Sequence, residues 1–283
     1  MKSNFKVYDS VHAFVGTRGN EQTIDRLALR TDEWTGPRNY KESKTYFLHG
    51  AGEDELSASR KLLNQIDVAV HGVQGEVWKP QVYGAYPVVA DYLAGDPMCM
   101  RNKEWDETDV APVRIILNTA VAAGVEADTI ARRAAASAAF AMKLSERRPV
   151  ELWISTALHN MRLKTDVGFR VKLDMPMNLS QVVAAYDRSV SRVLTSPILE
   201  LLANNDDPNA TESCDGYSFE LNGFNANRGG RHMYMKAFRD YMNLSEDDIV
   251  LDAGILTDCE AIDRNPVEWV KSMLIKYGMP SED

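Results

Sequence analysis

From Pro112 onward, apolar and polar residues recur at the spacings expected of strands and helices. Val113–Leu117 is an almost continuous apolar run rich in β-branched residues, which is typical of a buried strand. A helix is expected from a cap at Asp128 to about Glu146, with alanines on its inner face that permit close packing on a sheet. Val150–Ser155 alternates as a strand does, and the segment with Phe169, Val171 and Leu173 alternates in the same way.

The C-terminal part of the chain continues this alternation of strands and helices. Apolar positions from Leu179 to Leu194 predict a long helix that Pro197 should bend or end. Ile249–Leu251 predicts a short strand. The last helix is signalled by Asn265 as its cap, Pro266 at its first position, Glu268 completing a capping box and Gly278 as its stop. This order predicts an α/β fold of three layers, in which a mixed, Rossmann-like sheet with some parallel pairing is flanked by helices.

Residues 1–110 are less regular and predict an α+β region packed on that core. We expect residues 3–6 to lie in a frayed terminus, Thr45–Leu48 to form a short strand and Glu53–Gln65 to form a helix. Gly, Pro and Tyr are frequent between Val73 and Asp109, which predicts loops with short helical pieces. The whole chain is expected to form one compact unit, with its α/β core in residues 111–283 and a basic insertion in residues 204–245.

The composition is that of an ordinary globular protein. The 283 residues are 45% hydrophobic and 26% charged. No apolar run approaches the roughly 20 residues that cross a bilayer, and the first residues lack the apolar centre of a signal peptide. Cys99, Cys214 and Cys259 are scattered, so neither a disulfide framework nor a zinc site is predicted. We therefore expect a cytoplasmic protein with no membrane partner.

One segment departs from the acidic character of the chain, whose formal net charge is -9. Between Leu221 and Arg239 there is no acidic residue, and cations alternate with aromatic rings. Unpaired nucleic acid suits this combination, because phosphates pair with the cations while exposed bases stack on the rings. The candidate binding residues of this segment are Phe224, Arg228, Arg231, His232, Tyr234, Lys236 and Arg239.

A second group of cations and aromatic residues lies nearer the N-terminus, and we expect the two groups to form one groove. Residues such as Trp34 and Tyr40 more often pack under a loop than stack on bases. The segment Arg228–Arg239 is equally consistent with a solvated amphipathic helix. The candidate binding residues of this second group are Arg30, Trp34, Arg38, Tyr40, Lys41 and Lys44.

No set of residues in the sequence forms a convincing catalytic or metal site. Asp187–Ser191 spells D-x-S-x-S, which binds a metal when it forms a loop after a strand, but here it falls inside the predicted long helix. Gly50 and Gly52 are spaced as in dinucleotide sites, but a third glycine is missing and acids occupy the following helix start. We therefore predict no catalytic residue, no metal and no other cofactor, and expect the protein not to be an enzyme.

Several segments carry a resemblance to known phage proteins. They include GAYPVVADYLAGDPMCM, RRAAASAAFAMKLSERRPVELWIS, GFRVKLDMPMNLSQVVAAYDRSVSRVLTSPILELL and NPVEWVKSMLIKYG. These segments resemble phage-encoded proteins of a von Willebrand A-like type that lacks the metal. Within that group, the size and acidity of the chain are similar to those of the single-stranded-DNA-binding cofactors of the second RNA polymerase in N4-like phages. The resemblance implies a von Willebrand A-like fold, the host cytoplasm, a preference for single strands and recruitment of a phage RNA polymerase to opened promoters.

Two functions remain open from the sequence. The leading hypothesis is a non-enzymatic, single-stranded-DNA-binding transcription cofactor of a phage RNA polymerase. The alternative is a von Willebrand A-like protein-interaction module that partners an ATPase without binding DNA, with the acidic segment Glu246–Asp263 as its interface. A charged run of this kind is more often simply a solvated face. A homo-oligomer is compatible with both hypotheses.

Overall fold

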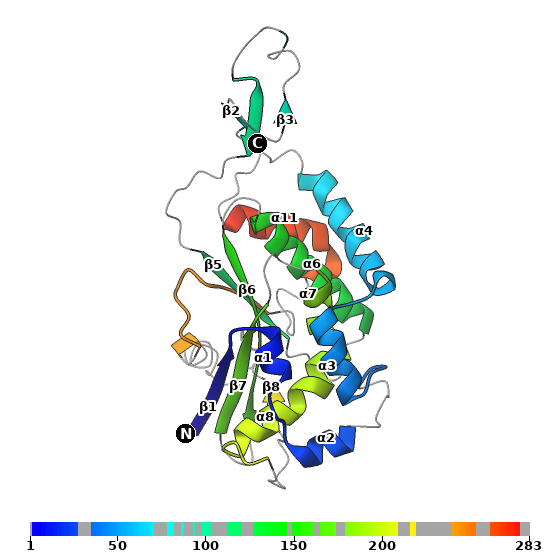
Figure 1. Ribbon diagram of the computed structural model, residues 1–283, viewed down its shortest axis with the longest axis vertical. Coiled ribbons are helices and arrows are strands. Elements are labelled where there is room, and N and C mark those ends of the chain that lie inside the picture. The colour runs from blue at the N-terminus through cyan, green and yellow to red at the C-terminus, as the bar shows by residue number, and fades with distance from the viewer. Residues whose placement is uncertain are drawn as a thin grey trace.

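A mixed β-sheet with helices packed against it forms the centre of the molecule, and a smaller sheet lies apart from it at one end of the long axis (Figure 1). The fold is therefore of the α/β class, as the sequence predicts. The computed structural model describes residues 2–27, 35–70, 78–81, 86–87, 93, 98–103, 112–119, 127–145, 149–160, 165–173, 179–208, 216–218, 239–240, 242–252 and 261–277.

The main sheet has the strand order β1-β7-β6-β5-β9. Neighbours β1 and β7, β5 and β6, and β5 and β9 run parallel, whereas β6 and β7 run antiparallel. The far end of β6 also pairs with β8 in antiparallel orientation. The predicted mixture of parallel and antiparallel pairing is thus confirmed. The strands are β1 (Lys2–Tyr8), β5 (Val113–Asn118), β6 (Val150–Asn160), β7 (Thr165–Lys172), β8 (Gly216–Ser218) and β9 (Ile249–Asp252).

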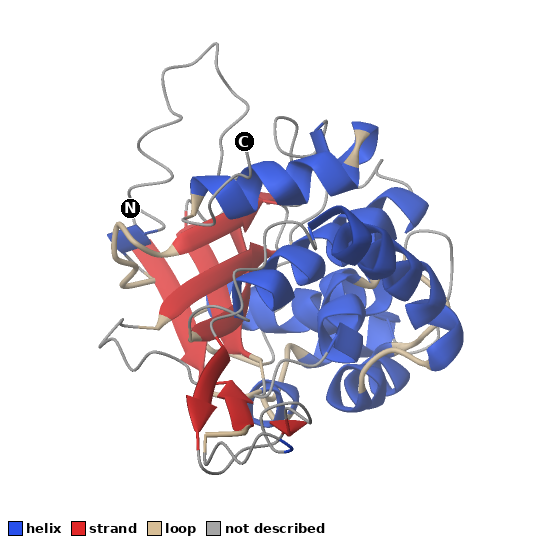
Figure 2. Cartoon of the chain, turned by 90° about the horizontal axis from the view of Figure 1, so that it is seen from above, coloured by secondary structure: helices blue, strands red, loops and turns tan. Residues whose placement is uncertain are grey.

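Helices cover one face of this sheet, and Figure 2 shows most of them gathered on one side. Ile115, Ile154 and Phe169 are fully buried on this face and pack with the helices in one hydrophobic core. No helix in the described ranges has both the length and the apolar character needed to cross a membrane. The helices are α1 (Val11–Val15), α2 (Glu21–Leu27), α3 (Tyr40–His49), α4 (Glu53–Val70), α6 (Ala127–Ser145), α7 (Leu179–Tyr186), α8 (Thr195–Ala203) and α11 (Pro266–Lys276).

The opposite face of the sheet carries a smaller apolar cluster. Ile116 of β5 and Trp153 and Ala157 of β6 pack there with Met242 and Leu244, which precede β9. A helical layer on this face, which the sequence analysis expects, is not seen in the part of the chain that the structure describes. This second face is therefore the one on which polar side chains of the strands meet the segment before β9.

The smaller sheet corrects one prediction for the N-terminal region. It is antiparallel, with the order β2-β4-β3, and its strands are β2 (Trp78–Gln81), β3 (Tyr86–Pro87) and β4 (Met100–Lys103). We expected loops with short helical pieces between Val73 and Asp109, which is wrong for these strands. The frequent Gly and Pro residues punctuate strands as readily as helices, so they give no preference for one over the other.

The predicted strand Thr45–Leu48 is also wrong, because these residues belong to α3. Asn39 caps the helix: its side chain accepts hydrogen bonds from the Lys41 and Glu42 amides, and the Glu42 carboxylate accepts one from the Asn39 amide. This reciprocal cap fixes the helix start and outweighs the local preference of aromatic residues for strands.

Residues 3–6 lie in β1 rather than in a frayed terminus. Asn4 and Lys6 point to the helix-covered face, which the other strands fill with apolar side chains. The Asn4 amide nitrogen donates to the Leu202 carbonyl of α8 at 3.0 Å. Polar residues at core-facing positions weaken the alternation of apolar and polar residues by which a half-buried strand is recognised. The sequence pattern therefore does not predict β1.

The predicted long helix does not end at Pro197. After α7 the chain continues as a π-helical segment, η2 (Ser189–Leu194), and then as α8. The Thr195 amide bonds to the Val190 carbonyl five residues back. This wider turn makes room for the ring of Pro197 in the first turn of α8. The backbone hydrogen-bond pattern changes locally, but the chain remains helical.

Candidate nucleic-acid interface

The second face of the main sheet gathers cations from neighbouring strands. Side chains alternate along a strand, so Arg114 of β5 and Arg170 and Lys172 of β7 point away from the helices. Lys172 lies opposite Trp153 of β6 in the register. Arg239, the last residue of the acid-free segment, reaches the same face through the segment before β9. We call Arg114, Trp153, Arg170, Lys172 and Arg239 the sheet-face cluster.

Arg114 and Arg239 both bond to Asp248, directly before β9. Arg114 forms a two-point ion pair with the Asp248 carboxylate, with Nε 2.8 Å from Oδ1 and Nη2 2.6 Å from Oδ2. Arg239 donates to the main-chain oxygens of Ser245 and Asp248, the latter at 3.1 Å. These contacts fix the end of the acid-free segment on the sheet. Among the described residues, Arg239 itself forms no ion pair with a carboxylate.

Trp153 lies between the two cations of β7. The centre of its ring is 4.6 Å from the guanidinium carbon of Arg170 and 5.7 Å from Lys172 Nζ, distances at which a ring face attracts a cation. Lys172 pairs with Glu151 at 2.7 Å, and the indole nitrogen donates to the other Glu151 oxygen at 3.4 Å. The hydrogen bond from Lys172 is the main reason that the pKa of Glu151 is lowered. Trp153 is 5% exposed, so it orients cations rather than offering a free stacking surface.

Arg170 differs from the other cations of the cluster because its donors are not satisfied. The residue is 8% exposed, and neither Nε nor Nη1 has a hydrogen-bond partner. Burial lowers the pKa of the guanidinium and the charge of Arg114 lowers it further, while the charges of Asp248, Asp9 and Glu151 act in the opposite direction. No carboxylate of the described residues forms an ion pair with Arg170.

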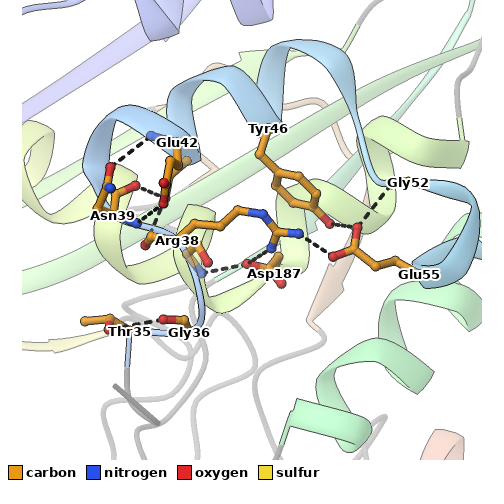
Figure 3. Close-up of polar contacts among 11 residues, drawn as sticks. Thr35, Gly36, Arg38, Asn39, Glu42, Tyr46, Gly52, Glu55 and Asp187 are labelled. Carbon is orange, nitrogen blue, oxygen red and sulfur yellow. Dashed lines mark hydrogen bonds and ion pairs between the residues drawn. The ribbon is translucent and has the colours of Figure 1, made fainter. Parts of the chain in front are cut away.

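The predicted residues around α3 form a separate group that is paired internally. Arg38 is hydrogen bonded to Glu55 of α4, and its Nη1 lies 3.5 Å from Asp187 Oδ1 (Figure 3). The guanidinium also lies 3.5 Å from the centre of the Tyr46 ring, whose hydroxyl donates to Glu55 at 2.8 Å. Burial alone would lower the pKa of Arg38, but the Glu55 hydrogen bond and the Asp187 charge raise it. Arg38 therefore joins α3, α4 and the end of α7.

The other described residues of this group differ in exposure. Tyr40 is 7% exposed, and burial raises its pKa to about 12, so its ring packs in the core, as one of the two interpretations of the sequence had it. Lys44 lies 4.9 Å from the centre of that ring, and burial lowers its pKa. Lys41 is exposed. DNA contacts by Lys41 and Lys44 stay predictions.

The described members of the two predicted groups lie on different sides of the main sheet. The aromatic residues of α3 pack in the core between the helices and the sheet, whereas Arg239 is bonded beside β9 on the opposite face. The single groove that we expected is therefore not formed between α3 and Arg239. The remaining predicted residues lie outside the described residues: Arg30, Trp34, Phe224, Arg228, Arg231, His232, Tyr234 and Lys236.

The acidic segment Glu246–Asp263 is partly used inside the fold. Asp248 pairs with Arg114, and Asp263 pairs with Arg133 of α6 at 2.7 Å. These two acids therefore hold the ends of the segment against β5 and α6. Asp248 is buried, whereas Asp263 is 31% exposed, so a solvated face does not describe Asp248. Both acids already have an ion-pair partner inside the fold.

The structure agrees with the earlier interpretation of the two sequence motifs. Asp187–Ser191 lies within a helical run, where Asp187 accepts a hydrogen bond from the Ser189 amide at 2.8 Å and faces Arg38. At the start of α4, Glu55 accepts a hydrogen bond from the Gly52 amide at 3.1 Å. Across the described ranges, no three His, Cys, Asp or Glu residues are grouped so as to hold a metal ion.

A comparison with protein families identifies the family to which this chain belongs. Residues 2–239 match a family described as a domain of unknown function, DUF7192. The chain belongs to the DUF7192 family. The match contains the whole sheet-face cluster and ends at Arg239, so the DUF7192 region leaves out only Asp248 among the partners of Arg114 and Arg239. No curated protein and no solved structure matches the chain.

Of the sheet-face cluster, only Arg239 is among the binding residues predicted from the sequence; Arg114, Trp153, Arg170 and Lys172 are not. The signal for these four was present, because each alternates with buried residues of a correctly predicted strand and must point to the other face. The missing information was the strand order, which brings β5, β6 and β7 side by side.

Proposed function

We propose that this DUF7192 protein is a non-enzymatic binder of single-stranded DNA that acts as a transcription cofactor. The observation that carries the proposal is the sheet-face cluster, where Arg239 is anchored on the face that holds the unsatisfied Arg170. Arg239, the last residue of the acid-free segment, thus lies on a sheet face that also holds an unpaired cation. Cations of both parts neutralise phosphates, while Phe224 and Tyr234 stack on bases, each for about 1–3 kcal/mol.

The preference for single strands follows from the aromatic residues, because only unpaired bases expose their faces for stacking. The rest of the protein is acidic, with a net charge of -9, and opposes the approach of a duplex except where cations are concentrated. The expected signature is an affinity that falls steeply with salt and varies little with sequence.

Fluorescence anisotropy with labelled oligo-dT at low salt tests this function on the full chain. We expect binding that weakens as salt rises, and weaker binding to a duplex of the same length. Polyphosphate is the matched competitor, because it offers phosphates without bases and should compete less well. The proposal is refuted if oligo-dT does not bind or if the duplex binds equally well.

The role in transcription adds a phage RNA polymerase as the partner. An opened promoter exposes a single strand. A protein that binds both this strand and the polymerase therefore raises the local concentration of the polymerase at the promoter. In vitro transcription on single-stranded and duplex templates tests this step: the protein should stimulate the single-stranded template. An unchanged yield of transcript on that template would refute the role in transcription but not the binding of DNA.

The alternative function, a module that partners an ATPase through its acidic segment, draws less support. Asp248 and Asp263 are the acids of that segment with described partners, and both are paired within the fold. An interface built on them would have to break ion pairs with Arg114 and Arg133.

A further inference from the structure

Arg170 is a buried cation whose hydrogen-bonding capacity is unused within the described structure. A guanidinium that is taken out of water without acceptors is destabilising, and proteins normally compensate by pairing it with an acid. The neighbouring cations follow this rule, since Arg114 pairs with Asp248 and Lys172 with Glu151. Arg170 does not, although it is 8% exposed and lies on the same face.

The surroundings hold the guanidinium in place without satisfying its donors. The Trp153 ring attracts the charge but accepts no conventional hydrogen bond from Nε or Nη1. Ser155, opposite Arg170 on β6, already donates its hydroxyl to the Phe169 carbonyl at 2.9 Å. The donors Nε and Nη1 of Arg170 are therefore oriented in advance and unpaired, and because both atoms are buried, an anion reaches them only when the atoms that cover them move aside.

Val7 is an exposed apolar residue directly beside Arg170. Val7 is the register partner of Arg170 on the edge strand β1, and it is 45% exposed. On the described part of the chain, no strand pairs with the outer edge of β1. An anion that approaches over Val7 meets the positive charge of Arg170 first and that of Arg114 behind it.

We propose that Arg170 anchors one phosphate group on the second face of the sheet. Phosphate is the anion that suits it, because its several oxygens accept charge-assisted hydrogen bonds from more than one guanidinium nitrogen. Resting on the function proposed above, this phosphate is a backbone phosphodiester of single-stranded DNA, with the adjoining sugar lying toward the apolar surface of Val7.

The test compares Arg170→Gln and Arg170→Lys with Arg132→Gln, which removes an exposed arginine of α6 on the helix-covered side. We expect Arg170→Gln to lower the affinity for oligo-dT about 10- to 100-fold. It should also reduce the slope of log affinity against log salt by about 0.7. Arg170→Lys should keep the slope and lose part of the affinity, and Arg132→Gln should change neither. Because the Gln variant removes an unpaired buried charge, its melting temperature should not fall.

Two outcomes would overturn the assignment of Arg170. One is an unchanged affinity and salt slope in Arg170→Gln. The other is a lower melting temperature in both Arg170 variants, which would show that the side chain supports the fold instead of a ligand.

Thermal shifts with inorganic phosphate separate this site from the proposed function. If oligo-dT fails to bind but phosphate stabilises the wild type and not Arg170→Gln, the DNA-binding function is wrong and the phosphate site stands. If oligo-dT binds equally well to both proteins and phosphate stabilises neither, the function stands and the site at Arg170 is wrong.

Discussion

Arg114 and Asp248 join β5 to the segment before β9 through a two-point ion pair that is buried on the aspartate side. The Asp248 side chain is 4% exposed, and its Oδ2 also accepts a hydrogen bond from the Ser245 amide at 2.6 Å. The main-chain oxygen of the same residue accepts from Arg239. One aspartate thus positions a strand arginine and the end of the acid-free segment together.

Replacing Asp248 by Asn should therefore destabilise the protein. Breaking a buried pair leaves an uncompensated charge and typically costs 3–5 kcal/mol, but Arg114 retains access to water, so we expect about 2 kcal/mol. Urea unfolding measures the difference. Asp247→Asn, a change of the same charge at the exposed neighbour, should stay within about 0.5 kcal/mol. Equal effects of the two substitutions would contradict this view of the pair.

The contact between Arg38 and Glu55 predicts a dependence of stability on pH. Burial by itself raises the pKa of Glu55, but hydrogen bonds from Arg38, Tyr46 and the Gly52 amide lower it below its ordinary value of 4.5. A depressed folded pKa stabilises the protein above the unfolded pKa, and this contribution is lost as pH falls through the folded pKa. Because Glu55 is partly exposed, we expect less than about 1 kcal/mol.

The urea midpoint, followed from neutral pH to below 4.5, measures this loss. The wild type should lose stability more steeply in acid than Glu55→Gln, which lacks the titrating group. Asp54→Asn, at an exposed acid in the same turn, should keep the steep wild-type profile. Parallel profiles for the wild type and Glu55→Gln would show that Glu55 is not held by Arg38.

Neutralising the acid-free segment should reduce DNA binding far more than neutralising α3. Replacing Arg228, Arg231 and Lys236 together by Ala should collapse the affinity for oligo-dT and lower the salt slope by about 2, because three phosphate contacts are lost. Anisotropy titrations at several salt concentrations measure both quantities. Replacing Lys41 and Lys44 by Gln tests the predicted DNA contacts on the opposite side of the sheet and should lower the slope less. A comparable loss in both variants would place DNA on the helix-covered side as well.

Close packing of β7 against its neighbours makes Gly168 sensitive to any side chain. A Cβ at this position would lie 2.7 Å from the Ala157 Cβ and 2.9 Å from Phe5 Cε1. Gly168→Ala should destabilise the protein by about 1–3 kcal/mol through overpacking. Adding Ala157→Gly to the same chain removes one of the clashing atoms and should recover part of the melting temperature. If Gly168→Ala alone melts at the wild-type temperature, β1 and β6 do not pack so closely against β7 at this position.

The buried core elements could be predicted because their signals repeat over many residues. Val113–Leu117 is apolar at nearly every position, and β5 is buried between two parallel neighbours. The alanines expected on the inner face of the Asp128–Glu146 helix are indeed buried in α6. Asn265 accepts a hydrogen bond from the Glu268 amide, as the predicted cap of the last helix requires.

Elements decided by distant contacts could not be predicted in the same way. β1 exists because β7 provides its hydrogen-bond partners, although Asn4 and Lys6 disguise its pattern. The candidate site also depends on distant contacts, so it could not be predicted from local sequence. Local sequence shows that Arg170 alternates with buried residues, but its lack of an acid partner depends on strand order and on where Asp248 and Glu151 bond.

The pairing of β1 with β7 also sets an order of assembly. Lys2 pairs with Thr165 and Tyr8 with Val171, so during synthesis the first strand waits for its neighbour. At ordinary rates of translation this delay is on the order of ten to thirty seconds. Until then Phe5 and Val7 have no sheet to join, and a nascent chain exposes them to other proteins. The edge that carries Val7 beside Arg170 is thus completed only after β7 has left the ribosome.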